Sequence, residues 1–258
     1  KPVIKILNKA DLADPELTKA WMEYLEQQDG VKAIACDNNK ADDVKRIIAL
    51  CKKMVPNKVG TGRQIKAMIM GIPNVGKSTL INTLAGRAVA RTGDEPAVTK
   101  SQQLIKLDDD IMLYDTPGML WPKVENENSG YRLAATGGIR DTAFDFADVA
   151  SYTAEYLMQA YPELLKSRYK IEELPKTDWE FFEVAGRNRG CVRAGNQVDT
   201  YRMSEILINE LRSGKLGDIT LETPAMTEAE ELVVAEQRIA AEEKRIAKEE
   251  EKRLRRLK

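Results

Sequence analysis

Glycine, lysine and serine are spaced around residue 71 in a way that can surround an anion. Gly71-Ile72-Pro73-Asn74-Val75-Gly76-Lys77-Ser78 matches G-x-x-x-x-G-K-[ST], a phosphate-binding pattern whose backbone amides wrap around phosphates at the beginning of a helix. An ordinary strand–turn–helix junction is the alternative, but the flanking apolar strand and helix favour phosphate binding. We expect Lys77 to bridge the β- and γ-phosphates and Ser78 to hold Mg²⁺. The other nucleotide contacts expected from this loop are those of Asn74, Val75, Gly76 and Thr79.

A second motif, Asp115-Thr116-Pro117-Gly118, follows the apolar run Ile111–Tyr114. An Asp at the end of a strand can reach Mg²⁺, usually through water, and a following Gly can offer its N–H to the γ-phosphate. Taken alone, these four residues also fit a common turn. Thr99 lies between the two motifs and can complete the Mg²⁺ shell when triphosphate is bound. Thr92 is the competing candidate, and we favour Thr99.

The third motif, Asn8-Lys9-Ala10-Asp11, has the pattern N-K-x-D after an apolar strand. A carboxylate at Asp11 can accept two hydrogen bonds, from N1–H and from the 2-amino group of guanine, which adenine does not offer. Asn8 would brace the loop, and the stem of Lys9 would cover the face of the base. An ordinary helix cap at Asp11 or Asp14 is the alternative. The two phosphate motifs in the same chain favour guanine recognition.

The order of the motifs is permuted, because N-K-x-D precedes the phosphate loop. In this order the chain resembles the circularly permuted GTPases, most closely the ribosome biogenesis GTPase A family of the YlqF type. The resemblance covers about residues 1–225 and rests on NKADL, GIPNVGKSTLIN, TGDEPAVTKSQQ, LYDTPGMLWPK and the YPELLKSRY and RGC segments. It implies GTP hydrolysis coupled to late assembly of the large (50S) ribosomal subunit, with rRNA and ribosomal proteins as partners.

Three departures from the family pattern matter. The family carries an F-P-G-H-M motif and a further strand ahead of N-K-x-D, so we expect a segment upstream of Lys1. The histidine that the resemblance implies in catalysis has no counterpart here. The base-loop position falls on Ala35-Cys36-Asp37, where the Cys36 N–H would meet guanine O6. Ala97 stands where the family commonly has Gly, which would stiffen the loop before Thr99.

Hydrolysis needs a group that positions water, and Met119 stands where many GTPases have a Gln. Asn74 resembles the Asn that helps hold K⁺ in potassium-activated GTPases, which makes K⁺ an expected activator. Asn74 can alternatively stabilise its own loop. The expected catalytic set is Lys77, Asn74, Thr99 and Gly118, and we expect slow turnover alone and faster turnover with ribosomal particles.

Strands and helices alternate in the first half of the chain and predict an α/β fold, a mostly parallel sheet with helices on both faces. We expect strands at 2–7, 31–36, 65–70, 102–107 and 111–114, and helices at 15–28, 41–54 and from about 78. The predicted GTPase domain spans 1–140, a helical domain 141–225 and a charged helical tail 226–258. For the tail, a single solvated helix is favoured over a coiled coil.

Composition excludes several classes of function. The chain has 40 basic and 41 acidic residues, so it lacks the overall positive charge of many nucleic-acid-binding proteins. Two local basic runs, Lys52–Lys66 and Arg187–Arg193, are either solvated surface or RNA contacts. With the resemblance we favour RNA contact for Arg187, Arg189 and Arg193. No histidine occurs, which excludes Ser-His and Cys-His nucleophile pairs.

Three widely separated cysteines favour a reducing cytoplasm without disulfides, and no run of eighteen apolar residues predicts a membrane helix. We expect a cytoplasmic protein that is monomeric away from the ribosome. The main alternative function is a nucleotide-gated scaffold for rRNA or ribosomal proteins, with incidental hydrolysis. A second alternative is the permuted GTPase type that acts on the small subunit. That type carries a zinc-binding Cys/His module, and the absence of histidine from this chain disfavours it. An ATP-dependent kinase would leave N-K-x-D without a purpose.

Overall fold

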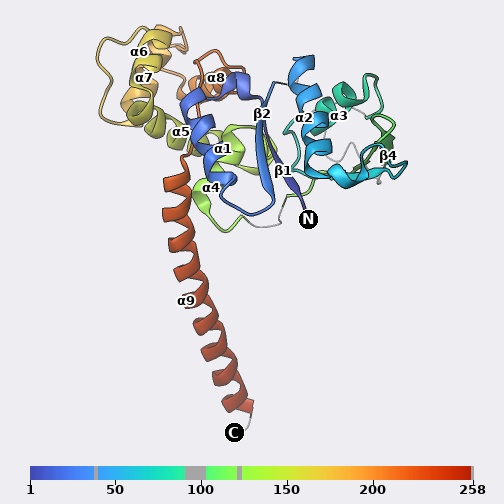
Figure 1. Ribbon diagram of the computed structural model, residues 1–258. Helices are drawn as coiled ribbons and strands as arrows, with labels where there is room; N and C mark the ends of the chain where they lie inside the picture. The colour runs from blue at the N-terminus through green and yellow to red at the C-terminus, as the bar shows by residue number, and fades with distance from the viewer. Residues whose placement is uncertain (38–39, 91–102, 121–123, 257–258) are drawn as a thin grey trace.

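The computed structural model describes residues 1–37, 40–90, 103–120 and 124–256. The first two strands, β1 (Val3–Asn8) and β2 (Val31–Cys36), pair in parallel, with Asn8 opposite Cys36 at their carboxyl ends. Helix α1 (Pro15–Leu25) connects them, and α2 (Ala41–Met54) follows β2. Figure 1 shows α1 and α2 on opposite sides of this pair, as predicted. The bounds of β2 and α2 are those that the sequence predicts.

A second sheet has the strand order β3-β5-β4. It consists of β3 (Ile65–Ile69), β4 (Gln103–Lys106) and β5 (Ile111–Asp115). β3 and β5 are parallel, whereas β4 and β5 form the antiparallel pair of the predicted hairpin. Two of the three pairings are therefore parallel, but the described strands form two sheets instead of the single sheet that we expected.

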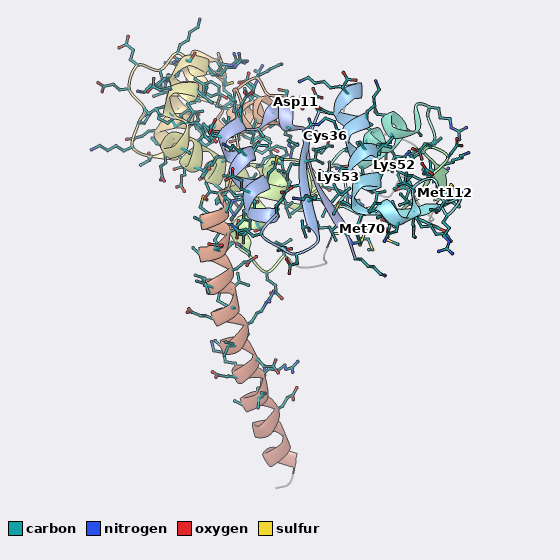
Figure 2. All side chains as sticks on the ribbon, in the orientation of Figure 1. Asp11, Cys36, Lys52, Lys53, Met70 and Met112 are labelled. Atoms are coloured by element: carbon teal, nitrogen blue, oxygen red, sulfur yellow. The ribbon has the colours of Figure 1, made fainter. Side chains whose placement is uncertain are left out.

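One apolar core nevertheless packs against both sheets. Helix α3 (Lys77–Ala85) contributes Leu80 and Ile81, and these pack with Ile34 of β2, Ile47 of α2 and Leu113 of β5. Apolar burial of this kind is the main force that joins elements without shared hydrogen bonds. The opposite side of the second sheet is exposed, and Met70, which Figure 2 labels just after β3, is 67% exposed.

The second half of the chain is helical. It contains α4 (Glu127–Ala135), α5 (Phe146–Ala160), α6 (Pro162–Tyr169), α7 (Asp178–Asn188) and α8 (Thr200–Arg212). Leu157, Phe181 and Leu207 are completely buried in its core, and the rings of Tyr169 and Phe181 meet edge to face at 5.6 Å. Helix α4 lies within the predicted GTPase domain, yet its last two residues, Ala134 and Ala135, are part of this helical core.

The chain ends in a long helix, α9 (Pro224–Arg256), which at 1.5 Å per residue is about 50 Å long. The predicted charged tail is therefore a helix. The first turns of α9 contact α1, and Figure 1 shows the remainder projecting away from the other elements. Leu232 and Ile239, apolar residues seven positions apart on α9, are exposed, as a single solvated helix predicts. Among the described helices, none is both long enough and apolar enough to cross a membrane.

Candidate nucleotide-binding site

The phosphate motif forms the turn between β3 and α3. Gly76 precedes α3 with a φ of +83°, and Asn74 also lies in the left-handed region, at +60°. These conformations favour Gly and Asn, and they bend the backbone back over the beginning of the helix. The stem of Lys77 lies over Gly71, because a Cβ added at Gly71 would be 4.0 Å from Lys77 Cδ. Ser78 follows in the first turn of α3, and Thr79 is exposed there.

The Asp-Thr-Pro-Gly turn lies directly against the phosphate loop. The Thr116 hydroxyl donates to Ile69 O at 2.6 Å, and the Met119 N–H donates to Gly71 O at 3.3 Å. A Cβ at Gly118 would lie 3.2 Å from backbone atoms of Pro73, so a side chain at this position would push the two loops apart. The close approach therefore favours glycine at this position. Met119 is 67% exposed.

Residues that can hold Mg²⁺ are Ser78 and Asp115. Asp115 ends β5, opposite Ile69 at the end of β3, and is 1% exposed. A hydroxyl and a carboxylate are oxygen ligands of the kind that Mg²⁺ prefers, and Mg²⁺ commonly takes only one or two protein ligands together with phosphates and water. The donor set therefore fits Mg²⁺. No cluster of three or more acidic or cysteine residues that could hold a metal by itself occurs in the described ranges. Thr99 and Thr92 lie outside the described residues.

The N-K-x-D motif is joined to the phosphate loop by a side chain. The Asn8 amide donates to Val75 O at 2.6 Å, although 67 residues separate them. Lys9 has a φ of +55° and is exposed, and Asp11 lies in the short 3-10 helix Ala10–Leu12 that follows. Among the described residues, none donates a hydrogen bond to the Asp11 carboxylate. Its two oxygens are thus available to a ligand.

Cys36 lies at the same end of the β1–β2 pair as Asp11, as Figure 2 shows. Its side chain is completely buried, and burial, followed by the nearby Asp43 and Asp37 carboxylates, raises the pKa of the thiol. Cys36 is therefore a neutral thiol near pH 7, and any contribution to base binding would come from its backbone. The N–H of Asp37 donates to the Asp43 carboxylate at 3.2 Å.

Sequence analysis did not identify Gly137 and Arg212, which lie next to the site. The Asn74 amide donates to Gly137 O at 3.1 Å, just beyond the end of α4. The Arg212 guanidinium of α8 donates to Ala134 O and Ala135 O at 2.7 and 2.9 Å and pairs with Asp141. It caps the carboxyl end of α4, where a cation is favourable. The Gly137-Gly138 pair is a helix-end signal, but nothing in the local sequence points to Arg212.

The three arginines predicted to bind RNA all make contacts within the protein. Arg187 pairs with Glu183 at 3.4 Å and Arg193 with Asp199 at 2.8 Å, both at the surface. Arg189 pairs at 2.6 Å with Glu210, which is 5% exposed. Burial acts to raise the pKa of Glu210, but Arg168, Tyr169 and Arg189 outweigh it and lower that pKa. Arg189 therefore stabilises a buried carboxylate, and RNA binding by all three stays a prediction.

The other basic run is also partly neutralised. Lys52, labelled in Figure 2, pairs with Asp108 at 2.7 Å and with Asp110 at 3.1 Å in the turn between β4 and β5. These hydrogen bonds raise the pKa of Lys52. Lys53, Lys58, Arg63 and Lys66 carry the rest of the positive charge of this run.

Comparison with known proteins agrees with this geometry. Residues 66–173 match the family described as 50S ribosome-binding GTPase. Ribosome biogenesis GTPase A of Priestia megaterium is 44% identical over 236 residues, 88% of this chain and 82% of the relative. The protein of the same name from Bacillus cereus is 47% identical over 231 residues, 87% of this chain and 78% of the relative.

Solved structures are similar as well. The GDP-bound structure of TM YlqF has a TM-score of 0.61 at 27% identity and covers 86% of this chain and 83% of its own. The GNP-bound YlqF from T. maritima has a TM-score of 0.59, also at 27% identity, and covers 86% and 81%. Both are similar over nearly the whole chain.

Proposed function

The chain belongs to the ribosome biogenesis GTPase A family of permuted GTPases, and on that premise we propose that it acts in late assembly of the large ribosomal subunit. As a GTPase, it hydrolyses GTP to GDP and phosphate. The observation that carries the guanine-nucleotide part of the proposal is the hydrogen bond from Asn8 to Val75 O, because it joins a guanine-type motif to a phosphate loop. The family match over residues 66–173 supports the 50S subunit as the partner.

Base recognition falls to the end of the β1–β2 pair. The Asp11 carboxylate accepts hydrogen bonds from guanine N1–H and the 2-amino group, and adenine leaves both oxygens unpaired. The stem of Lys9 covers one face of the base, and Asn8 holds the loop against Val75 O. The Cys36 N–H donates to guanine O6. GTP and GDP are therefore selected over ATP and ADP.

Phosphate binding falls to the loop 71–79 and the Asp-Thr-Pro-Gly turn. The amides of Val75, Gly76 and Thr79 and the Lys77 ammonium hold the phosphates, and the Gly118 N–H donates to the γ-phosphate. The oxygens of Ser78, Asp115 and Thr99 would hold Mg²⁺, directly or through water. Mg²⁺ would supply positive charge beside the phosphates.

Slow hydrolysis follows from what surrounds the γ-phosphate. Met119 cannot orient water, and no His exists in the chain. Asn74 donates its amide N–H to Gly137 O, which fixes the orientation of the amide. The amide oxygen of Asn74 would then be available to hold K⁺ near the phosphates. K⁺ should therefore increase kcat more than Na⁺, and Asn74→Ala should abolish the difference while GDP binding is retained.

The decisive test is GTP turnover with and without purified large-subunit particles, with small-subunit particles as the control. We expect stimulation by large-subunit particles on the order of 10³-fold or more, the range for charge supplied in trans. Stimulation by neither particle, with normal GTP binding, would favour the scaffold alternative. Equal stimulation by both would remove the large subunit as the specific partner.

Contact with rRNA belongs to the same proposal. Arg187 and Arg193 lie at the surface with 49% and 65% of their side chains exposed, and their single ion pairs can exchange for phosphate. Arg189 would have to leave Glu210 to do so, so we expect it to contribute least. We further propose that the protein acts in the cytoplasm and is a monomer when it is not bound to a subunit.

A further inference from the structure

Helix α4 contacts the nucleotide site beyond its carboxyl end and follows the Gly118 turn in the chain. Asn126, the residue that caps its beginning, follows the Gly118 turn closely in the chain. Beyond its end, Gly137 O accepts from Asn74, and a Cβ at Gly138 would lie 3.2 Å from the side chain of Ile72. A change in the phosphate loop can therefore reach α4 through Gly137 and Gly138, and Gly118 lies a short stretch of chain before the helix.

A buried ion pair then joins α4 to the C-terminal helix. Arg132 of α4 is 6% exposed and donates to both carboxylate oxygens of Glu230 of α9, at 2.8 and 2.6 Å. It also donates to Glu222 at 3.1 Å. The side-chain amides of Asn126 and Asn128 donate to the same Glu230 carboxylate, at 2.7 and 3.0 Å. Three side chains of α4 thus converge on one residue of α9, an arrangement that we call the α4 clamp.

The beginning of α9 also contacts the helix that follows the base motif. The Trp21 indole N–H of α1 donates to Glu222 O, just before α9, at 3.0 Å. Burial, followed by the nearby Glu228 and Glu231 carboxylates of α9, raises the pKa of Tyr24 in α1. The first turns of α9 are therefore held by α1, which follows Asp11, and by α4, which follows Gly118. Figure 1 shows the rest of α9 projecting from this point.

We infer that Glu230 is a positioning residue for the nucleotide site: through the α4 clamp, docking of α9 and the occupancy of the γ-phosphate position change each other's free energy. The inference rests on the proposed function only in requiring that Gly118 contacts the γ-phosphate. Coupling between two sites is reciprocal, so removing the clamp must change the preference for triphosphate over diphosphate. Without Glu230, the buried guanidinium of Arg132 keeps Glu222 as its carboxylate partner among the described residues, and α4 is less firmly held.

The test compares the full chain with Glu230→Gln and uses Glu236→Gln as the matched control. Glu236 is an exposed residue on the same helix and makes no hydrogen bond or ion pair with the described residues. The measurement is the ratio of the dissociation constants of GDP and of a non-hydrolysable GTP analogue. We expect Glu230→Gln to change this ratio fivefold or more, the lower end of typical couplings, and Glu236→Gln to leave it within twofold.

Hydrogen exchange at residues 224–231 provides the readout that a purely structural role would not move. In the unaltered chain, exchange there should differ between the GDP and GTP-analogue states, and in Glu230→Gln the difference should disappear. Should Glu230→Gln not fold, Asn128→Ala removes one donor to Glu230 and should shift the ratio in the same direction by a smaller factor. An unchanged ratio in folded variants, with exchange insensitive to the nucleotide, overturns the inference. If the unaltered chain does not bind GTP, the proposed function is overturned instead.

Discussion

Leu157, Phe181 and Leu207 in the helical region are completely buried, whereas in the nucleotide site Asn74 is exposed and a buried Asn8 oxygen has no hydrogen-bond partner among the described residues. In the helical region the buried Glu210 is paired with Arg168 and Arg189. The loops of the nucleotide site depend instead on left-handed backbone and close approaches. The helical region is stabilised by its own side chains. In the nucleotide site, a bound ligand is needed to complete the hydrogen bonding of the polar groups.

The largest expected effect tests the first half of this comparison. Phe181→Ala removes a completely buried ring and should lower the free energy of unfolding by about 3–5 kcal/mol. Trp179→Ala, on the same helix but 64% exposed, should change it by less than about 0.5 kcal/mol. Denaturant unfolding followed by circular dichroism measures both. Similar losses in the two variants would mean that this core does not stabilise the region.

The α4 clamp lies between the two regions and should respond to acid. Hydrogen bonds from Arg132, aided by Asn126 and Asn128, lower the pKa of Glu230 from 4.5 to about 2 although burial opposes them. Glu222 and Tyr152 also face this cluster, and burial raises the pKa of each. Because the folded pKa of Glu230 is the lower one, its carboxylate stabilises the protein above pH 4.5 and loses that contribution as the pH falls toward about 2.

The size of this effect is about 3 kcal/mol at neutral pH. The difference in unfolding free energy between the unaltered chain and Glu230→Gln should therefore be greatest near neutral pH and should shrink as the pH falls below 4.5. Glu236→Gln should give a small difference at every pH. A difference for Glu230→Gln that does not vary with pH contradicts the assigned ion pair.

On the nucleotide side, Lys77→Ala should weaken GDP and GTP binding by about 1.5–3 kcal/mol, the contribution of a hydrogen bond to a charged group. Lys66→Ala, an exposed lysine on β3, is the control and should bind nucleotide normally. Titration of a fluorescent nucleotide gives the affinities, and circular dichroism should remain native in both variants. Native folding with unchanged affinity for Lys77→Ala would make the loop purely structural.

Base selectivity should give a slightly smaller effect. Asp11→Asn replaces one acceptor oxygen with a donor and should cost about 1–3 kcal/mol in GTP affinity, with little change for ATP. Asp29→Asn, in the exposed loop before β2, is the control for the change in charge. Competition between GTP and ATP is the measurement, and equal binding of both by the unaltered chain would refute guanine recognition.

Local patterns in the sequence predicted most elements of the fold. Alternating apolar residues and flanking turns placed β2 and α2 at their observed bounds. The region 141–225, predicted to be helical, contains α5, α7 and α8. Helix α4 was not predicted, since its Asn, Ser and Gly residues are poor helix formers. It is held by tertiary contacts, with Ala134 and Ala135 in the helical core and Arg132 paired to Glu230.

For the site, the candidate nucleotide-binding residues could be predicted from the sequence, but the contacts between their motifs could not. Asn8, Asn74 and Gly118 were recognised from short motifs, whereas the contacts that connect these motifs span long stretches of chain. Arg212 and Glu230 act on α4 from distant helices and belong to no motif. Only the folded arrangement brings such residues together, so single-sequence reasoning identifies ligand contacts better than the residues that position them.

The most direct test of the account is hydrogen exchange across the full chain with GDP, with ADP and without nucleotide, all with Mg²⁺. At a concentration one hundred times its Kd, GDP stabilises the bound state by about 2.7 kcal/mol. We predict slower exchange with GDP, and not with ADP, at residues 8–12, 71–79 and 115–119, and unchanged exchange in the buried parts of α5, α7 and α8. Equal protection by ADP, or protection confined to the helical core, would contradict a guanine-nucleotide site assembled from these three motifs.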